Sequence, residues 1–174
     1  NQPEPGRCHA PVVGDSDRIA AVTQRCDERH DARLHTEAVP RTEDTAVDVG
    51  HGQLASGLRS DPRVVVWERT NLRDLTLAHV EGEPVDLIVG DVSFISLRLL
   101  LRPLLAVLRP SGSALLLVKP QFEVGRAGLD DHGVVRSAAL RTQAVTAVIQ
   151  TAGKLGWRAD WHGASSLPGE SGNV

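Results

Sequence analysis

A series of short, almost wholly apolar runs separated by helix-like segments constrains the fold of this chain most. Strands of a parallel sheet that are buried on both faces have this composition, whereas half-exposed strands alternate apolar and polar residues. The runs predict strands over Ala46–Val49, Arg63–Glu68, Val85–Gly90, Ala114–Val118 and Gly156–Trp161.

Helices are expected between these runs. The spacing predicts a short helix over Gln53–Arg59, a loop with a short helix over Leu72–Val80, and longer helices over Leu97–Leu108 and Ser137–Leu155. The segment 109–112, Arg-Pro-Ser-Gly, is typical of a helix stop. Alternating strands and helices indicate an α/β fold with a doubly wound parallel sheet and helices on both of its faces.

Residues 1–45 differ from the rest of the chain. They are rich in Asp, Arg, Glu and His, contain no aromatic residue and show no sustained period, although Ile19–Leu34 can form a polar helix. A segment of this kind is expected to be disordered. It can also be non-native sequence, such as a frameshifted reading, and the chain contains no methionine. We therefore divide the chain into residues 1–45 and a folded domain over 46–174.

Composition excludes several classes of protein. The formal net charge of −3 gives no global signal for nucleic acid, and no uninterrupted apolar run reaches the roughly 20 residues that cross a bilayer. Cys8 and Cys26 fit no zinc or redox spacing. We expect a cytoplasmic protein with no membrane segment and no bound metal.

Polar residues follow four of the predicted strands. They are Asp48, the segment Glu68–Asn71, Asp91 and Lys119. Ligands of an open parallel sheet bind outside the carboxyl ends of its strands, so these side chains are the candidate site.

One short motif offers a nicotinamide-dependent alternative. Residues 50–55, Gly-His-Gly-Gln-Leu-Ala, match the G-x-G-x-x-A loop of dinucleotide-binding proteins, and Glu68 stands 18 residues after Gly50, where an acid can hold a ribose. The chain can therefore be an NAD-dependent oxidoreductase. That interpretation leaves Asp91 and Lys119 without a role.

Longer segments resemble one enzyme family. DVSFISL at 91–97 combined with VKPQFEVG at 118–125 resembles the haemolysin A family of ribosomal RNA ribose 2′-O-methyltransferases, which is similar to the FtsJ-like ribose methyltransferases. AVDVGHGQL, RVVVWERTNLRDL, GVVR and SSLPGESGNV extend the resemblance over residues 46–174. It implies a Rossmann-like methyltransferase fold, S-adenosylmethionine as cofactor, and ribosomal RNA or ribosomal subunits as partner, with cytidines of 16S and 23S rRNA as targets.

The resemblance also implies roles for individual residues. Asp48 matches the acid that holds the cofactor's ribose hydroxyls, Gly50 lets the backbone pass close to the cofactor, and Asn71 with Leu72 meets the adenine. Asp91 and Lys119 match two members of a Lys-Asp-Lys-Glu catalytic tetrad, and Asp91 also borders the cofactor. A lysine amine can take the proton of a ribose hydroxyl while a carboxylate orients that amine.

Three departures from the family limit this expectation. No Asp-x-Gly-x-x-x-Gly-Gly-Phe loop precedes Ala46, and neither the first lysine nor the glutamate of the tetrad is identified. We therefore expect a partial methyltransferase domain that is incomplete at its first strand, with impaired activity. A non-catalytic RNA-binding fragment is the remaining alternative.

Overall fold

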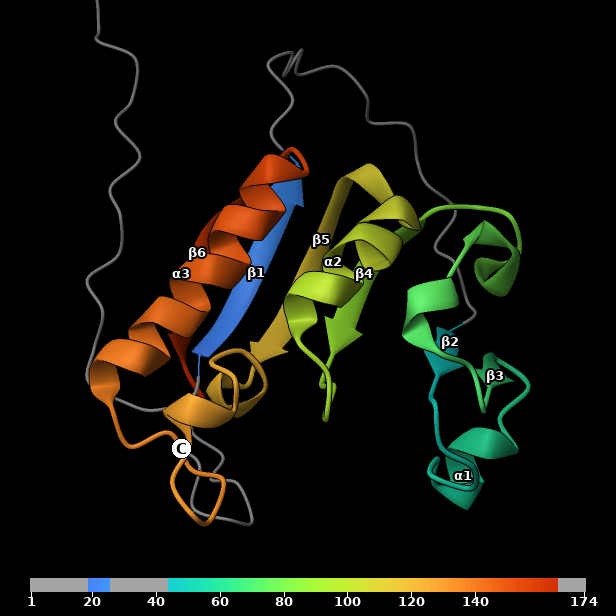
Figure 1. The fold of residues 1–174 in the computed structure, drawn as a ribbon. Coiled ribbons are helices and arrows are strands. Elements are labelled where there is room, and N and C mark those ends of the chain that lie inside the picture. Colours follow the sequence, from blue (N-terminus) through green and yellow to red (C-terminus); the bar gives the residue numbers. More distant parts are fainter. Residues whose placement is uncertain (1–18, 26–43, 166–174) are drawn as a thin grey trace, which may run out of the picture.

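Two stretches of the chain are described in the computed structural model, residues 19–25 as backbone only and residues 44–165 with side chains (Figure 1). The strands are β1 (Ile19–Arg25), β2 (Asp44–Val47), β3 (Val64–Trp67), β4 (Val85–Gly90), β5 (Leu108–Val118) and β6 (Trp157–Ala164). The helices are α1 (Ser56–Arg59), α2 (Leu97–Ala106) and α3 (Ala138–Lys154), with 3₁₀ turns η1 (Leu72–Asp74), η2 (Leu77–Val80), η3 (Pro120–Phe122) and η4 (Arg126–Gly128).

A four-stranded sheet in the order β4-β5-β1-β6 forms the larger part of the described structure. Strands β4 and β5 run parallel, with Ile88 opposite Ala114. Strand β1 runs antiparallel to both β5 and β6. Strand β1 lies within the segment 1–45 for which disorder is expected, at the start of the stretch Ile19–Leu34 that the sequence also allows as a polar helix. The rest of that segment, up to residue 43, lies outside the described residues.

Strands β2 and β3 form a separate parallel pair, with Asp44 opposite Val64 and Val47 opposite Trp67. The expected single, doubly wound sheet is therefore not found among the described residues, because β2 and β4 do not pair with each other. The coarser expectation is confirmed: the fold is mixed α/β with parallel strands.

Helices α2 and α3 contact each other and lie on one face of the four-stranded sheet (Figure 1). The expectation that helices cover both faces is wrong for the described part of the chain. Leu87 and Val89 of β4 and Leu115 of β5 alternate with residues that face the helices, and their side chains are exposed.

The core lies between α2, α3 and β5. Buried leucines of α2 recur at the i, i+3, i+4 spacing that places them on one helix face: Leu97, Leu100, Leu101, Leu104 and Leu105. They pack against the alternate β5 residues Ala114, Leu116 and Val118 and against Val145, Val148 and Ala152 of α3. Pro103 inside α2 lacks the N–H that would bond the carbonyl of Leu99, an exposed residue whose carbonyl can bond water.

The limits of β4 and the start of α3 are as predicted, whereas the limits of β2, α1, α2, β5 and β6 differ from the predicted ones. Strand β4 has the predicted limits, and Ser137 caps α3 by accepting from the N–H of Leu140 over 3.3 Å. Strand β5, however, begins at Leu108 and includes the predicted stop 109–112. The ladder shifts register there, and a Cβ on Gly112 would lie 2.9 Å from the carbonyl oxygen of Asp86. Glycine allows this close approach of two backbones.

Two leucines on α2 test this packing. Leu101 is fully buried, whereas Leu99 on the same helix is 56% exposed. Leu101→Ala should lower the free energy of unfolding by about 2–5 kcal/mol because it leaves a cavity. Leu99→Ala should change it by less than about 0.5 kcal/mol. Urea unfolding followed by circular dichroism measures both, and equal losses would contradict this assignment of the core face.

Candidate functional site

Asp48 lies directly after β2, where the ladder with β3 continues. The Asp48 N–H donates to the carbonyl of Trp67 over 2.9 Å. The Asp48 carbonyl accepts from the N–H of Thr70 over 3.0 Å. The Gly50 N–H donates to Asp48 Oδ1 over 2.6 Å. The Asp48 side chain is exposed, so a carboxylate held in a fixed orientation is accessible to a ligand.

Gly50 makes this turn possible. A Cβ at this position would lie 2.8 Å from Gln53 Cγ and 3.0 Å from Asp48 Oδ1. Because the glycine has no side chain, its backbone passes beside the carboxylate without obstruction. The sequence placed Gly50 in the candidate site, and the structure brings it against Asp48.

Glu68 follows β3 and holds the loop from the other side. Its carboxylate accepts from Gly52 N–H over 2.8 Å, contacts His51 Nδ1 at 2.6 Å and pairs with Arg59 of α1. The hydrogen bond from Arg59, with those from Gly52 and His51, lowers the pKa of Glu68 to about 2. The nicotinamide alternative needs this acid for a ribose, but its oxygens already bond groups of its own loop.

Asn71 caps η1 and Leu72 begins it, directly after Thr70, whose N–H donates to the carbonyl of Asp48. Asn71 is exposed, and its Oδ1 accepts from the N–H of Arg73 over 3.0 Å, which caps the turn. Leu72 is half-buried, packs against the core and lines a pocket. The side-chain amide of Asn71 and the apolar side chain of Leu72 are thus presented from one short turn.

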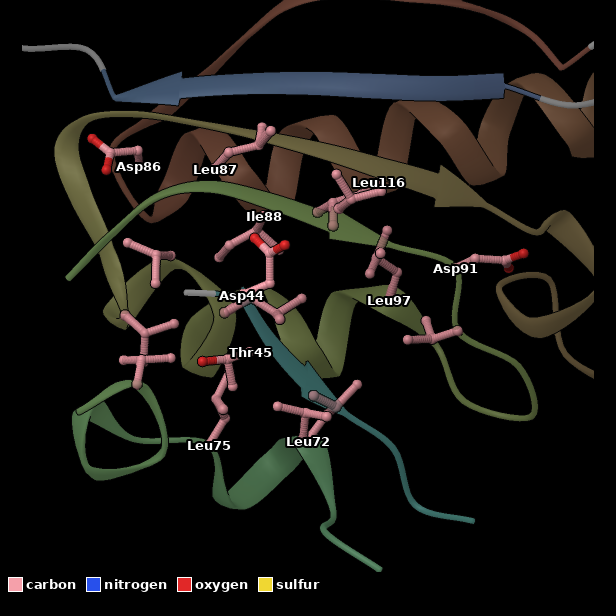
Figure 2. A pocket seen from close by; sticks show the side chains of 18 of the residues that line it. Asp44, Thr45, Leu72, Leu75, Asp86, Leu87, Ile88, Asp91, Leu97 and Leu116 are labelled. Carbon is pink, nitrogen blue, oxygen red and sulfur yellow. The ribbon is translucent and has the colours of Figure 1, made fainter. Parts of the chain in front are cut away.

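The pocket occupies about 760 Å³ between β2 and β4 (Figure 2). Thr45, Val47 and Leu72 lie on the β2 side, opposite Ile88 and Asp91 on the β4 side. This volume is within the usual range of small-molecule sites. Of the residues predicted from the sequence, only Leu72 and Asp91 line the pocket, whereas Asp48, Gly50, Asn71 and Lys119 do not.

Asp91 and Lys119 come together at the carboxyl ends of β4 and β5. Lys119 Nζ lies 2.5 Å from Asp91 Oδ1 and donates to Ser93 Oγ over 2.7 Å. The Lys119 side chain is 16% exposed and that of Asp91 66%. Most of the Lys119 side chain is thus covered, while its acidic partner remains open to a ligand.

An exposed aromatic side chain stands beside this pair. Phe94 is 92% exposed, and its ring centroid lies 5.4 Å from that of Phe122. Its backbone has φ of +62°, in the left-handed region that side chains other than glycine rarely adopt. Strained backbone of this kind is concentrated at functional sites.

Sequence reasoning missed two features of the site. It gave Glu68 a specific role only in the nicotinamide alternative and not in its own loop, and it gave no role to Glu123, which the structure buries beside the Asp91 segment. The only sequence signal for Glu123 is that it is an acid four residues after Lys119.

Over residues 19–25 and 44–165, no helix is long and apolar enough to cross a membrane. Within the same ranges, no group of three or more His, Cys, Asp or Glu residues is placed to hold a metal ion.

Comparisons with known proteins converge on one family. The FtsJ-like methyltransferase family matches residues 31–174, which begins earlier than the resemblance drawn from residue 46. The 16S/23S rRNA (cytidine-2′-O)-methyltransferase TlyA of Mycobacterium tuberculosis is 51% identical over 129 residues, 74% of this chain and 48% of that protein. The putative rRNA methyltransferase YqxC of Bacillus subtilis is 41% identical over 129 residues, 74% of this chain and 46% of its own length.

Solved structures agree with the sequence comparison. The crystal structure of a putative hemolysin from Lactococcus lactis matches with a TM-score of 0.68 and 38% identity, over 76% of this chain and 64% of that one. The chain spans about half the length of the curated relatives it matches.

The carboxylate of Glu68 gives the site a dependence on pH. Its pKa of about 2 lies below the ordinary value of 4.5, so the stability it contributes is present above about pH 4.5 and is lost as pH falls to about 2. Glu68→Gln should lower the free energy of unfolding at neutral pH. Between about pH 4.5 and pH 2 the stability of this variant should depend less on pH than that of the unmodified chain. Urea unfolding across this pH range measures the effect. Exposed Asp131→Asn is the control, and identical profiles for the two variants would contradict the role of Glu68.

Proposed function

Because the chain belongs to the FtsJ-like methyltransferase family, we propose that it carries an S-adenosylmethionine-dependent methyltransferase domain that acts on ribose 2′-hydroxyls of ribosomal RNA. The observation that carries the proposal is the contact between Asp91 and Lys119 at the carboxyl ends of two paired strands. The named targets of the M. tuberculosis relative, 16S and 23S rRNA cytidines, are the proposed substrates here. A ribosomal substrate places the protein in the cytoplasm.

The residues after β2 and β3 fit the cofactor. Asp48 offers an exposed carboxylate that can accept from two ribose hydroxyls, and Gly50 leaves the space beside it that a Cβ would fill. Leu72 offers an apolar surface for adenine, and the Asn71 amide can bond its polar edge. When bound, S-adenosylmethionine supplies an activated methyl group on a sulfonium.

Lys119 and Asp91 perform the acid–base work in this proposal. The 2′-hydroxyl is a very weak acid, so its proton must be taken up as the oxygen forms its new bond. In its neutral form, after its own proton has gone to solvent, Lys119 Nζ takes that proton and becomes an ammonium, which Asp91 stabilises at 2.5 Å and which then releases the proton to water. Ser93 fixes the direction of the amine through its hydrogen bond.

Phe94 supports a nucleic-acid substrate. A large aromatic side chain that is 92% exposed beside the acid–base pair offers a surface on which a base can stack. We assign it to contact with an unstacked base at or next to the nucleotide that is methylated, because exposed aromatic rings offer stacking surfaces to single-stranded RNA.

Single substitutions of Lys119, Asp91 and Lys154 test the catalytic assignment. Lys119→Met and Asp91→Asn should each lower methyl transfer to ribosomal subunits by about 10²–10⁴-fold, the contribution of positioned proton transfer. Lys154→Met removes the other lysine, at the exposed end of α3, and should leave transfer unchanged. Incorporation of a labelled methyl group measures the rate. Full activity of Lys119→Met would refute the assignment, and RNA binding without any transfer would favour a non-catalytic RNA-binding role.

Cofactor binding is tested at Asp48. Asp48→Ala should weaken binding of S-adenosylmethionine by about 10- to 100-fold, because hydrogen bonds to a charged group contribute about 1.5–3 kcal/mol. Asp61→Ala, which removes a carboxylate from the turn before β3, should not change the affinity. Titration calorimetry measures both. Tight binding of NAD in place of S-adenosylmethionine would support the oxidoreductase alternative instead.

A further inference from the structure

Among the described residues, Glu123 is the one polar or charged residue that is buried. Its side chain is 1% exposed. It lies directly after η3, the turn that begins next to Lys119. A carboxylate this deeply buried is costly unless hydrogen bonds and an opposite charge compensate it, so its partners indicate what it holds.

Those partners are three consecutive residues at the start of α2. Ser96 Oγ donates to Glu123 Oε2 over 2.7 Å, and the Leu97 N–H donates to Oε1 over 2.6 Å. Arg98 Nε donates to Oε2 over 2.9 Å, and the Arg98 guanidinium also donates to the Glu123 carbonyl over 3.2 Å. Glu123 therefore satisfies an N–H of the first turn of α2 from another part of the chain, a role usually filled by a residue of the helix itself.

The same two segments carry the acid–base pair. Residues 91–96 run from Asp91 into α2, and residues 119–123 run from Lys119 to Glu123. Contacts join the segments at one end through Asp91 and Lys119, in the middle through the phenylalanine rings, and at the other end through Glu123. Each segment is thus fixed at both ends.

We propose that Glu123 is a positioning residue. It holds residues 119–123 against residues 91–96 and thereby keeps the Lys119 amine beside Asp91. Its importance for catalysis rests on the function proposed above, but the positioning itself does not. A merely structural role would stabilise α2 and leave the environment of Lys119 unchanged.

A carboxylate is required because both of its oxygens accept. Glutamine has nearly the same shape but one acceptor oxygen, so it leaves either Leu97 N–H or Arg98 Nε facing an amide NH₂. Glu123→Gln therefore breaks one connection without opening a cavity. Ser96→Ala removes one hydrogen bond and is the milder second variant.

The chain is suited to a direct test because Lys119 and Lys154 are its two lysines. Trace acetylation of the folded chain, read by mass spectrometry, gives the labelling ratio of Lys119 to exposed Lys154. Glu123→Gln should raise this ratio several-fold, and Ser96→Ala should raise it less. Asp130→Asn is the control, since Asp130 orders a different loop through Val134 and Arg136.

The labelling ratio decides the inference whether or not the chain methylates RNA. An unchanged ratio in folded Glu123→Gln overturns it, and if that variant does not fold, an unchanged ratio in Ser96→Ala overturns it. Where the unmodified chain is active, Glu123→Gln should lower kcat by about 10- to 100-fold with KM for the cofactor unchanged, because a small misplacement of a catalytic group has effects of that size. Absence of transfer by the unmodified chain contradicts the proposed function alone.

Discussion

The parallel pairing of β4 with β5 is the constraint on which the candidate site depends. Two adjacent parallel strands end at the same edge of a sheet, so the residues that follow them are neighbours however far apart they stand in the sequence. Asp91 and Lys119 meet for this reason. The leucines of α2 pack against one face of this pair of strands. The positions of the two strand ends are therefore fixed by packing in the core.

Carboxylates fill three different roles in the described structure, two of them after the β2–β3 pair and one after β5. Asp48 is exposed and is held by one backbone N–H, which suits a group that binds a ligand. Glu68 is largely enclosed by donors of its own loop and maintains the shape of that loop. Glu123 is buried and joins two segments. Exposure and the number of donors separate these roles, although the residue types are nearly the same.

Short stretches of sequence were sufficient to predict the elements that depend mainly on neighbouring residues. Strand β4 and the cap of α3 follow from a short apolar run and a serine before a helical pattern. The pairing of Asp91 with Lys119 followed from the strand-end rule. Three outcomes depend on distant contacts and could not be predicted this way: the extension of β5 through Arg109–Gly112, the strand at Ile19–Arg25, and the burial of Glu123. In each case a partner far along the sequence overrides the local signal.

The strained backbone of Phe94 has a consequence for recognition. A loop that is ordered only when a ligand arrives loses conformational entropy at that moment, and affinity falls accordingly. Here the segment is already fixed on both sides of the ring, by Asp91 with Lys119 and by Ser96 with Glu123. The entropy is lost during folding, so in the function proposed above a base would meet a ring whose backbone is already in place, and the energy of stacking would be retained as binding energy.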